Sequence, residues 1–293
     1  MLVNPHSAGG RTLKLVPEVE RELGRQGLAY RMVETQSLDH GVEEATRAAE
    51  SGEVPVVMSG DGLVGQIGGA LVETGSQMGI IPGGRGNDLA RVLGIPNDPA
   101  GAVAVLAKRQ EREIDVGVAN HRRFLCVASC GFDSECNRVA NETRLIKGNL
   151  VYAYSALRVL ASWKPATFTV VLDGGEPIVF EGYSVAVGNS RAFGGGMFIA
   201  PHADLDDGML DVITIADVGK LRYLRGIPSV FKGTHIKKEE VGEARAATVE
   251  IRADREFAVY ADGEHLTELP ATLSTLPGAL RVIAPPKPET VPT

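Results

Sequence analysis

Residues 54–63 read Val-Pro-Val-Val-Met-Ser-Gly-Asp-Gly-Leu, an apolar run that ends in a glycine turn. The run Val54–Met58 is too short for a helix, and its β-branched residues favour a buried strand. Amphipathic stretches lie on both sides, one from Ser37 as N-cap to Gly52 and one over Val64–Glu73. A short apolar strand between two helices is typical of a parallel sheet that is covered on both faces.

The same alternation runs through the first third of the chain. We expect strands at Leu2–Val3, Tyr30–Val33 and Met78–Ile81, and helices at Pro17–Gly24, with the proline in the first turn, and at Asn87–Leu93. Ligands of such sheets bind at the carboxyl ends of the strands.

After about residue 112 the pattern changes to hairpins. Turn residues at 120–122 and 173–175 are flanked by strand-like runs, which predicts antiparallel pairing. The expected strands are Glu113–Ala119, Phe124–Cys130, Thr167–Leu172, Ile178–Val187, Leu210–Ile215, Thr248–Arg252, Phe257–Tyr260 and Leu280–Ile283, with helices near 148–162 and 218–231. The sequence therefore predicts an α/β N-terminal domain with a parallel sheet, at 1–118 and completed by 278–288. A β-rich antiparallel sandwich domain follows at 119–277, and the Pro-rich residues 289–293 form a tail.

Composition narrows the class of protein further. The 293 residues carry 30 Lys+Arg against 37 Asp+Glu, a formal net charge of −7, and no dense basic block, so nucleic acid is not expected as a partner. Three cysteines and a start without a secretion signal predict a reducing cytoplasm. The longest apolar stretch, around Val151–Trp163, is interrupted by Arg158, so we expect at most peripheral contact, at the inner face of a membrane. Whether the chain forms a homodimer is left open.

Three glycine turns follow the first, third and fourth expected strands. They are Asn4-Pro5-His6-Ser7-Ala8-Gly9-Gly10, Ser59-Gly60-Asp61-Gly62 and Pro82-Gly83-Gly84-Arg85-Gly86-Asn87-Asp88. Because the ends of parallel strands meet at one edge of a sheet, these turns predict a phosphate-binding rim of backbone N–H groups. Neither a Walker A loop nor a G-x-G-x-x-G motif opens the first helix, which disfavours common NTPase and dinucleotide folds.

These turns, together with Gly131-Phe132-Asp133, Asp206–Asp211 and Asp262-Gly263-Glu264, resemble the diacylglycerol kinase and sphingosine kinase superfamily, most closely its bacterial soluble lipid kinases. The resemblance covers nearly the whole chain. It implies a nucleotide-binding α/β domain of the NAD kinase/diacylglycerol kinase type and a β-rich domain that offers the lipid hydroxyl, with ATP and Mg²⁺ as cofactors.

The resemblance also implies roles for individual residues. The nucleotide is expected at Asn4, Ser7, Gly9, Thr35, Gly60, Asp61, Gly62, Arg85 and Asn87. Glu264 is expected to be the base that takes the hydroxyl proton, with Asp262 second. Asp133 and Glu135 match the region that faces the lipid headgroup. A largely structural Mg²⁺ is expected on the carboxylate of Asp207 and the carbonyls of Asp204 and Met209.

The sequence therefore predicts an ATP-dependent kinase that phosphorylates a diacylglycerol-like or sphingoid lipid at a membrane surface. It departs from the family at Leu63, Gly65, Gln66 and Arg85, of which Arg85 stands in place of threonine. Two alternatives stay open: an NAD kinase-like phosphotransferase, and a nucleotide-binding regulator that has lost turnover.

Overall fold

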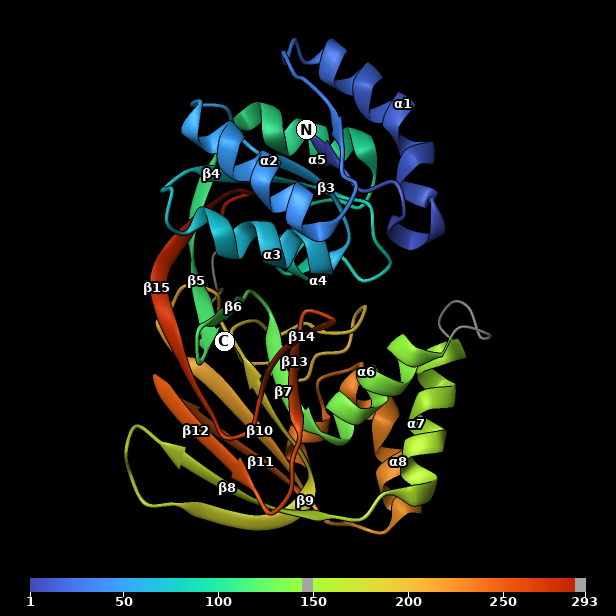
Figure 1. The fold of residues 1–293 in the computed structure, drawn as a ribbon, viewed down its shortest axis with the longest axis vertical. Coiled ribbons are helices and arrows are strands. Elements are labelled where there is room, and N and C mark those ends of the chain that lie inside the picture. The colour runs from blue at the N-terminus through green and yellow to red at the C-terminus, as the bar shows by residue number, and fades with distance from the viewer. Residues whose placement is uncertain (144–149, 288–293) are drawn as a thin grey trace. The chain divides into compact units, whose positions relative to one another are not determined.

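A computed structural model of the protein describes residues 1–143 and 150–287 (Figure 1). The chain divides into two compact units. The first comprises Met1–Val116 and the segment from Pro277 onward, and the second comprises Gly117–Leu276. Two strands, β5 (Glu111–Ala119) and β15 (Ala271–Ile283), each begin in one unit and end in the other.

The first unit is built on a parallel sheet with the strand order β2, β1, β3, β4, β15. The strands are β1 (Leu2–Val3), β2 (Val33–Glu34), β3 (Val56–Ser59) and β4 (Gln77–Pro82), and the last partner of β4 is the end of β15. Val57, Met58 and Ile80 are almost fully buried, as expected for strands covered on both faces. This confirms the predicted parallel sheet.

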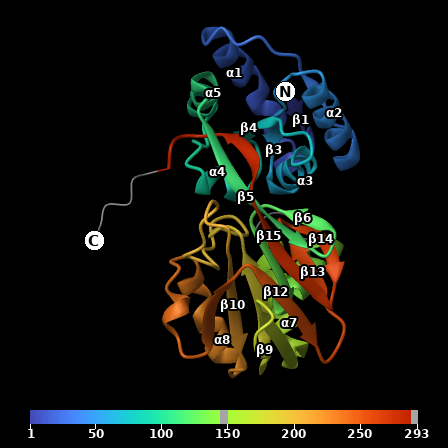
Figure 2. The same ribbon diagram turned by 90° about the vertical axis from the view of Figure 1, so that its left-hand side faces the viewer.

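Helices cover both faces of this sheet. α2 (Leu38–Glu50) packs with α3 (Asp61–Leu71) on one face, and α1 (Arg11–Arg25) packs with α5 (Pro99–Lys108) on the other (Figure 2). The short α4 (Asp88–Val92) follows β4, and a 3-10 turn (Ser7–Gly9) precedes α1. The predicted cap of α2 is present, because the Ser37 hydroxyl accepts the His40 N–H at 3.0 Å.

The bounds of two elements, α1 and β2, differ from the sequence prediction. α1 begins at Arg11, so Pro17 lies in the helix interior rather than in its first turn. The apolar face around Pro17, with Val16 and Val19 buried, offsets the one backbone hydrogen bond that a proline removes. β2 contains only Val33 and Glu34, and the preceding residues from Tyr30 lie outside it.

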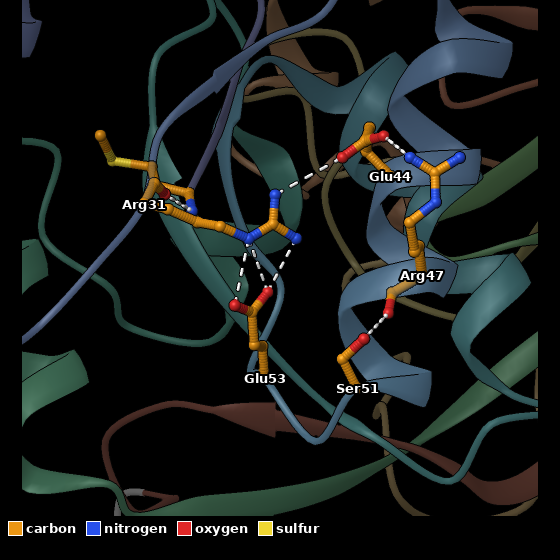
Figure 3. Close-up of polar contacts among 6 residues, drawn as sticks. Arg31, Glu44, Arg47, Ser51 and Glu53 are labelled. Carbon is orange, nitrogen blue, oxygen red and sulfur yellow. Dashed lines mark hydrogen bonds and ion pairs between the residues drawn. The ribbon is translucent and has the colours of Figure 1, made fainter.

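A polar network holds this edge of the sheet (Figure 3). The Arg31 guanidinium donates to Glu53 at 2.8 Å and lies 3.5 Å from the Glu44 carboxylate on α2. The Met1 ammonium donates to the Arg31 carbonyl oxygen at 2.6 Å. Residues before β2 are thus tied to α2 and to the start of β3 by exposed ion pairs rather than by strand pairing.

The second unit is an antiparallel β-sandwich, as predicted. Its strands are β6 (Arg122–Phe124), β7 (Val127–Gly131), β8 (Ala166–Leu172), β9 (Ile178–Gly188), β10 (Leu210–Ala216), β11 (Val241–Ala246), β12 (Thr248–Ala253), β13 (Ala258–Ala261) and β14 (Glu264–Glu268). β14, β13, β7, β9, β8, β12 and β15 follow one another in hydrogen-bonded order, and β10 joins β9 to β11. The hairpins predicted at 120–122 and 173–175 are both present as β5–β6 and β8–β9. The expected strand Phe124–Cys130 is divided in two.

Three helices pack against this sandwich: α6 (Phe132–Glu142), α7 (Leu150–Ser162) and α8 (Lys220–Val230), and a 3-10 turn (His235–Lys237) follows α8. Their aromatic side chains join the core. The rings of Tyr183 and Tyr223 stack with centroids 4.1 Å apart, and Phe132 meets Trp163 edge to face at 5.4 Å. The first two residues of the helix predicted at 148–162, and the predicted tail 289–293, lie outside the described residues.

Candidate functional site

Two of the glycine turns of the first unit touch through their backbones. A Cβ added to Gly84 would lie 2.3 Å from the Gly60 Cα, and one added to Gly60 would lie 3.1 Å from the Gly84 Cα. No side chain fits at either position without displacing the other turn. The turns after β3 and β4 therefore form one continuous backbone surface at the carboxyl edge of the sheet.

Asp61, the first residue of α3, fixes this surface. Its carboxylate accepts the Asn87 N–H at 2.9 Å and the Asp88 N–H at 2.6 Å, at the N-terminus of α4. Burial raises the pKa of Asp61, against the backbone N–H groups of Asp88 and Asn87, which lower it. Asp61 thus orders the turn after β4, and the backbone around it stays available to a ligand.

The turn after β1 is joined to the turn after β4 by hydroxyl groups. The buried Thr12 hydroxyl donates to the Gly83 carbonyl oxygen at 2.8 Å, and the Ser7 hydroxyl donates to the same oxygen at 3.5 Å. Asn4 shapes the start of the turn, because its side-chain oxygen accepts the His6 N–H at 2.9 Å. Gly9 has a φ of +69°, which favours glycine. The structure thus brings Asn4, Ser7 and Gly9 together with the other two turns.

Thr35, the other nucleotide residue expected in this unit, is 4% exposed. Its N–H and hydroxyl both donate to the Val3 carbonyl oxygen, at 2.8 and 3.4 Å. In this structure Thr35 joins the ends of β1 and β2, and its contact with a nucleotide stays a prediction.

Arg85 lies at the tip of the turn after β4, and its side chain is exposed. The turn is closed around it, since the Asn87 side-chain oxygen accepts the Gly84 N–H at 2.8 Å and Arg91 donates to the Gly86 carbonyl oxygen at 3.1 Å. Asn87 itself adopts a φ of +51°. Within residues 1–143 and 150–287, the Arg85 guanidinium makes no ion pair. A cation is therefore held on an ordered backbone and is available to an anionic ligand.

Two of the positions at which the chain departs from the family are packing positions. Leu63 is 1% exposed, and a Cβ added to Gly41 of α2 would lie 2.7 Å from a Leu63 methyl carbon. Gly65 is also buried in α3. Leu63 thus belongs to the contact between α2 and α3, and Gly65 lies buried within α3.

In the second unit, Asp262 and Gly263 form the turn of the β13–β14 hairpin, with φ values of +52° and +89°. The Asp262 carboxylate accepts the Leu125 N–H at 2.8 Å and the Cys126 N–H at 3.0 Å. These two bonds explain why β6 and β7 are separate strands, because the residues between them bond to Asp262 instead of to a ladder. Asp262 is therefore a structural residue of this hairpin.

Glu264, the first residue of β14, differs from Asp262. Its side chain is exposed, and within the described part of the chain its carboxylate has no hydrogen-bond partner. Partial desolvation by the surrounding protein nevertheless raises the pKa of Glu264. A carboxylate with a free lone pair and a raised pKa is the better proton acceptor of the two.

The residues expected at a lipid headgroup open helix α6. Burial raises the pKa of Asp133 to about 6. Glu135 forms an ion pair with Arg138 at 2.8 Å. Glu135 also lines a groove of about 550 Å³, together with Arg138, Val139, Glu142, Arg158, Val159, Ser162, Trp163, Lys164, Arg255, Glu256 and Phe257. Acidic, basic and apolar side chains all line this groove.

The expected Mg²⁺ segment is the turn before β10. Asp207 uses one carboxylate oxygen to accept the Met209 N–H at 3.0 Å and the other to bind the Arg245 guanidinium. Both oxygens of the one carboxylate expected on the metal thus already have partners. No three His, Cys, Asp or Glu side chains gather as a metal-ligand group anywhere in residues 1–143 and 150–287. The ligands expected at Asp204 and Met209 are backbone carbonyls and stay a prediction, whereas the Asp207 carboxylate, already bound to Arg245 and to the Met209 N–H, does not fit the role of a metal ligand.

Comparisons with known proteins agree with this architecture. The family profile named "Diacylglycerol kinase catalytic domain" matches residues 1–119, and "YegS C-terminal NAD kinase beta sandwich-like domain" matches residues 126–284. A diacylglycerol kinase structure from Bacillus anthracis, 22% identical, covers 97% of this chain and 96% of its own, with a TM-score of 0.74. An NAD kinase from Archaeoglobus fulgidus in complex with ATP is 14% identical with a TM-score of 0.51, and covers 94% and 88%.

The two units thus define a protein of the NAD kinase and diacylglycerol kinase fold class. A diacylglycerol kinase from Mycobacterium tuberculosis is 35% identical over 97% of this chain and 94% of its own length. A protein of Chromohalobacter salexigens named "Probable lipid kinase YegS-like" is 30% identical over 94% and 91%. This chain belongs to the diacylglycerol kinase family of lipid kinases.

Proposed function

We propose that the protein transfers the γ-phosphoryl group of ATP to a hydroxyl of a diacylglycerol-like or sphingoid lipid. The observation that carries this proposal is the backbone surface formed by Gly60 and Gly84 and fixed by Asp61. Membership in the family supports the reaction class, and the names of the relatives support the acceptor class.

The first unit would hold the nucleotide. Its glycine turns let phosphate oxygens approach backbone N–H groups closely, and the exposed Arg85 adds a positive charge at the same edge. Phosphoryl transfer depends mainly on placement and on neutralising charge, so a rigid backbone surface with one cation suits it. Mg²⁺ enters this proposal only as the ion that accompanies ATP.

The second unit would supply the base. Glu264 has a carboxylate with no hydrogen-bond partner among the described residues, and its raised pKa suits it to take the acceptor proton. Asp262 holds the hairpin from which Glu264 projects, so we assign it no proton transfer. Asp133 and Glu135 remain proposed contacts of the lipid headgroup.

The protein would bind the acceptor lipid at the surface of a bilayer, through peripheral contact with the membrane. Among the described residues no helix combines the length and the apolarity that a bilayer crossing requires.

The test is transfer of label from [γ-³²P]ATP to diacylglycerol, sphingosine, phosphatidylglycerol and NAD. Glu264→Gln should lower kcat by about 10²–10⁴-fold and leave ATP affinity unchanged. Glu268→Gln is the matched control, because Glu268 lies on the same strand and pairs with His265 at 2.8 Å. Equal turnover by the two variants would remove Glu264 from the mechanism.

The same assay decides between the alternatives. Transfer to NAD alone would favour an NAD kinase-like enzyme, and retained ATP affinity without transfer to any acceptor would favour a regulator. Leu63 and Gly65 are buried in α3, and the contact between Gly60 and Gly84 is present alongside these two departures, which argues against the regulator.

A further inference from the structure

Arg245 on β11 binds two aspartates of the segment that the family resemblance predicts as a metal site. It forms an ion pair with Asp207 in the turn before β10, and its Nε lies 3.6 Å from an Asp211 carboxylate oxygen. Asp211 and Arg245 are directly opposite each other in the β10–β11 ladder. The guanidinium therefore spans the turn and the strand that follows it.

The position of Asp211 requires a nearby positive charge. It is 1% exposed, and within residues 1–143 and 150–287 neither of its carboxylate oxygens has a hydrogen-bond partner. A buried carboxylate without a counter-charge or donors is costly, so the ion pair with Arg245 is the contact that compensates it. Asp207 shares the same cation, and its other oxygen accepts the Met209 N–H, which closes the turn.

A second pair of side chains also connects this segment to β11. Glu243, two residues before Arg245 on β11, has a carboxylate oxygen 2.9 Å from the His202 Nδ1, and it accepts the hydrogen bond when that nitrogen carries a proton. Between these pairs the apolar Leu205 is 1% exposed and anchors the segment in the protein. The segment 202–211 is thus held to β11 at two points by side chains of this chain.

We propose that Arg245 is an internal cation that orders the turn Asp204–Asp211, in place of the divalent metal that the family resemblance predicts there. A guanidinium can bind two carboxylates at once through its fixed fork of N–H donors. A metal bound to Asp207 would compete with Arg245 for the Asp207 carboxylate. This inference concerns folding of the second unit and does not depend on the proposed function.

The test uses the full-length protein without nucleotide, so that no ion bound to ATP interferes. Thermal unfolding is measured in 5 mM EDTA and in 5 mM MgCl₂, where we expect the same Tm for the wild type. Arg245→Ala should lower the Tm, by roughly 2–6 °C, in both buffers, because it leaves Asp211 without a counter-charge. Arg252→Ala is the matched control, since Arg252 is an exposed arginine on β12 whose ion-pair partner is the half-buried Glu250.

A second measurement does not require the alanine variant to fold. Mn²⁺ binding to nucleotide-free protein, followed by electron paramagnetic resonance, should be the same for the wild type and for Asp207→Asn. A wild-type Tm that rises in MgCl₂, or Mn²⁺ binding that is lost in Asp207→Asn, would show a metal at this turn and overturn the proposal. An Arg245→Ala protein as stable as the Arg252→Ala control would overturn it as well.

Discussion

Replacing Gly84 by alanine tests the backbone contact between the two glycine turns. The new Cβ would lie 2.3 Å from the Gly60 Cα and 2.9 Å from the Asn87 side-chain oxygen. Ordinary van der Waals contact begins at 3.4 Å, so the two turns must separate by about 1 Å. Neither turn can yield by rotating a side chain, because the closest atom belongs to the backbone.

The magnitude follows from that displacement. Overpacking of this kind costs about 1–3 kcal/mol of folding free energy, which lowers the Tm by about 2–4 °C for each kcal/mol. A misplacement of about 1 Å at a site that works by positioning costs on the order of 10² in rate. We therefore expect Gly84→Ala to lose far more phosphoryl transfer than stability.

The assay measures kcat/KM for ATP with the best acceptor, together with binding of a fluorescent ATP analogue. Gly24→Ala is the control, because Gly24 lies in α1 with no atom within 4 Å of an added Cβ. It should leave transfer unchanged and stabilise the helix slightly. If Gly84→Ala binds nucleotide and turns over within twofold of the wild type, the contact between the turns does not order a nucleotide site.

Further expectations concern single residues. Asp262→Ala should lower the free energy of unfolding by about 2 kcal/mol in urea titrations, because two backbone N–H groups lose their acceptor, and Asp262→Asn should lose about half as much. The pKa of Glu264 is raised above its usual 4.5, so kcat/KM should rise with pH as this carboxyl ionises, with the midpoint of the rise at a pH above 4.5. This acid limb should be absent from the residual activity of Glu264→Gln. Burial lowers the pKa of His235 from its ordinary 6.5, so the unfolded chain binds the proton better; stability should fall as pH decreases through 6.5, and the urea midpoint of His235→Gln should depend less on pH. Arg31→Ala, which removes the exposed network of Figure 3, should lower the Tm slightly at low salt and not measurably in 1 M NaCl.

Local signals in the sequence were sufficient for most of the fold. The apolar run before Ser59 and the cap at Ser37 predicted β3 and the start of α2 within two residues. Helix α5 carries equally clear signals that the sequence reasoning passed over, since Asp98 caps it through the Gly101 N–H and Pro99 opens it. The start of α2 and the whole of α5 could therefore be predicted from local signals in the sequence.

Elements made by distant partners were harder to predict. β11 contains glycine, glutamate and arginine, which are poor strand formers, and it pairs because β10 offers an unpaired edge. The division between β6 and β7 depends on Asp262, which is 136 residues away from Cys126. Local propensity contains no information about such contacts.

The same limit applies to the candidate site. Glycine spacing predicted which turns meet, but not that the Asp61 carboxylate would bond to the backbone of the neighbouring turn. Thr12 was missed because a threonine at the start of a helix has no special sequence signal. The engagement of Asp207 by Arg245 also lay outside sequence reasoning, since it depends on the register of β10 with β11.

The course of β15 has a consequence for how this protein can be divided. Its first half pairs with β12, and its last residues, Arg281 and Val282, are parallel partners of β4. A fragment that stops at Val116 would leave the backbone N–H and C=O groups at the edge of β4 without a strand partner. The second unit is one continuous segment, Gly117–Leu276, whereas the first is made of two. A gene encoding the first unit alone would therefore have to be rearranged, with residues from Pro277 onward joined to Val116 by a new linker.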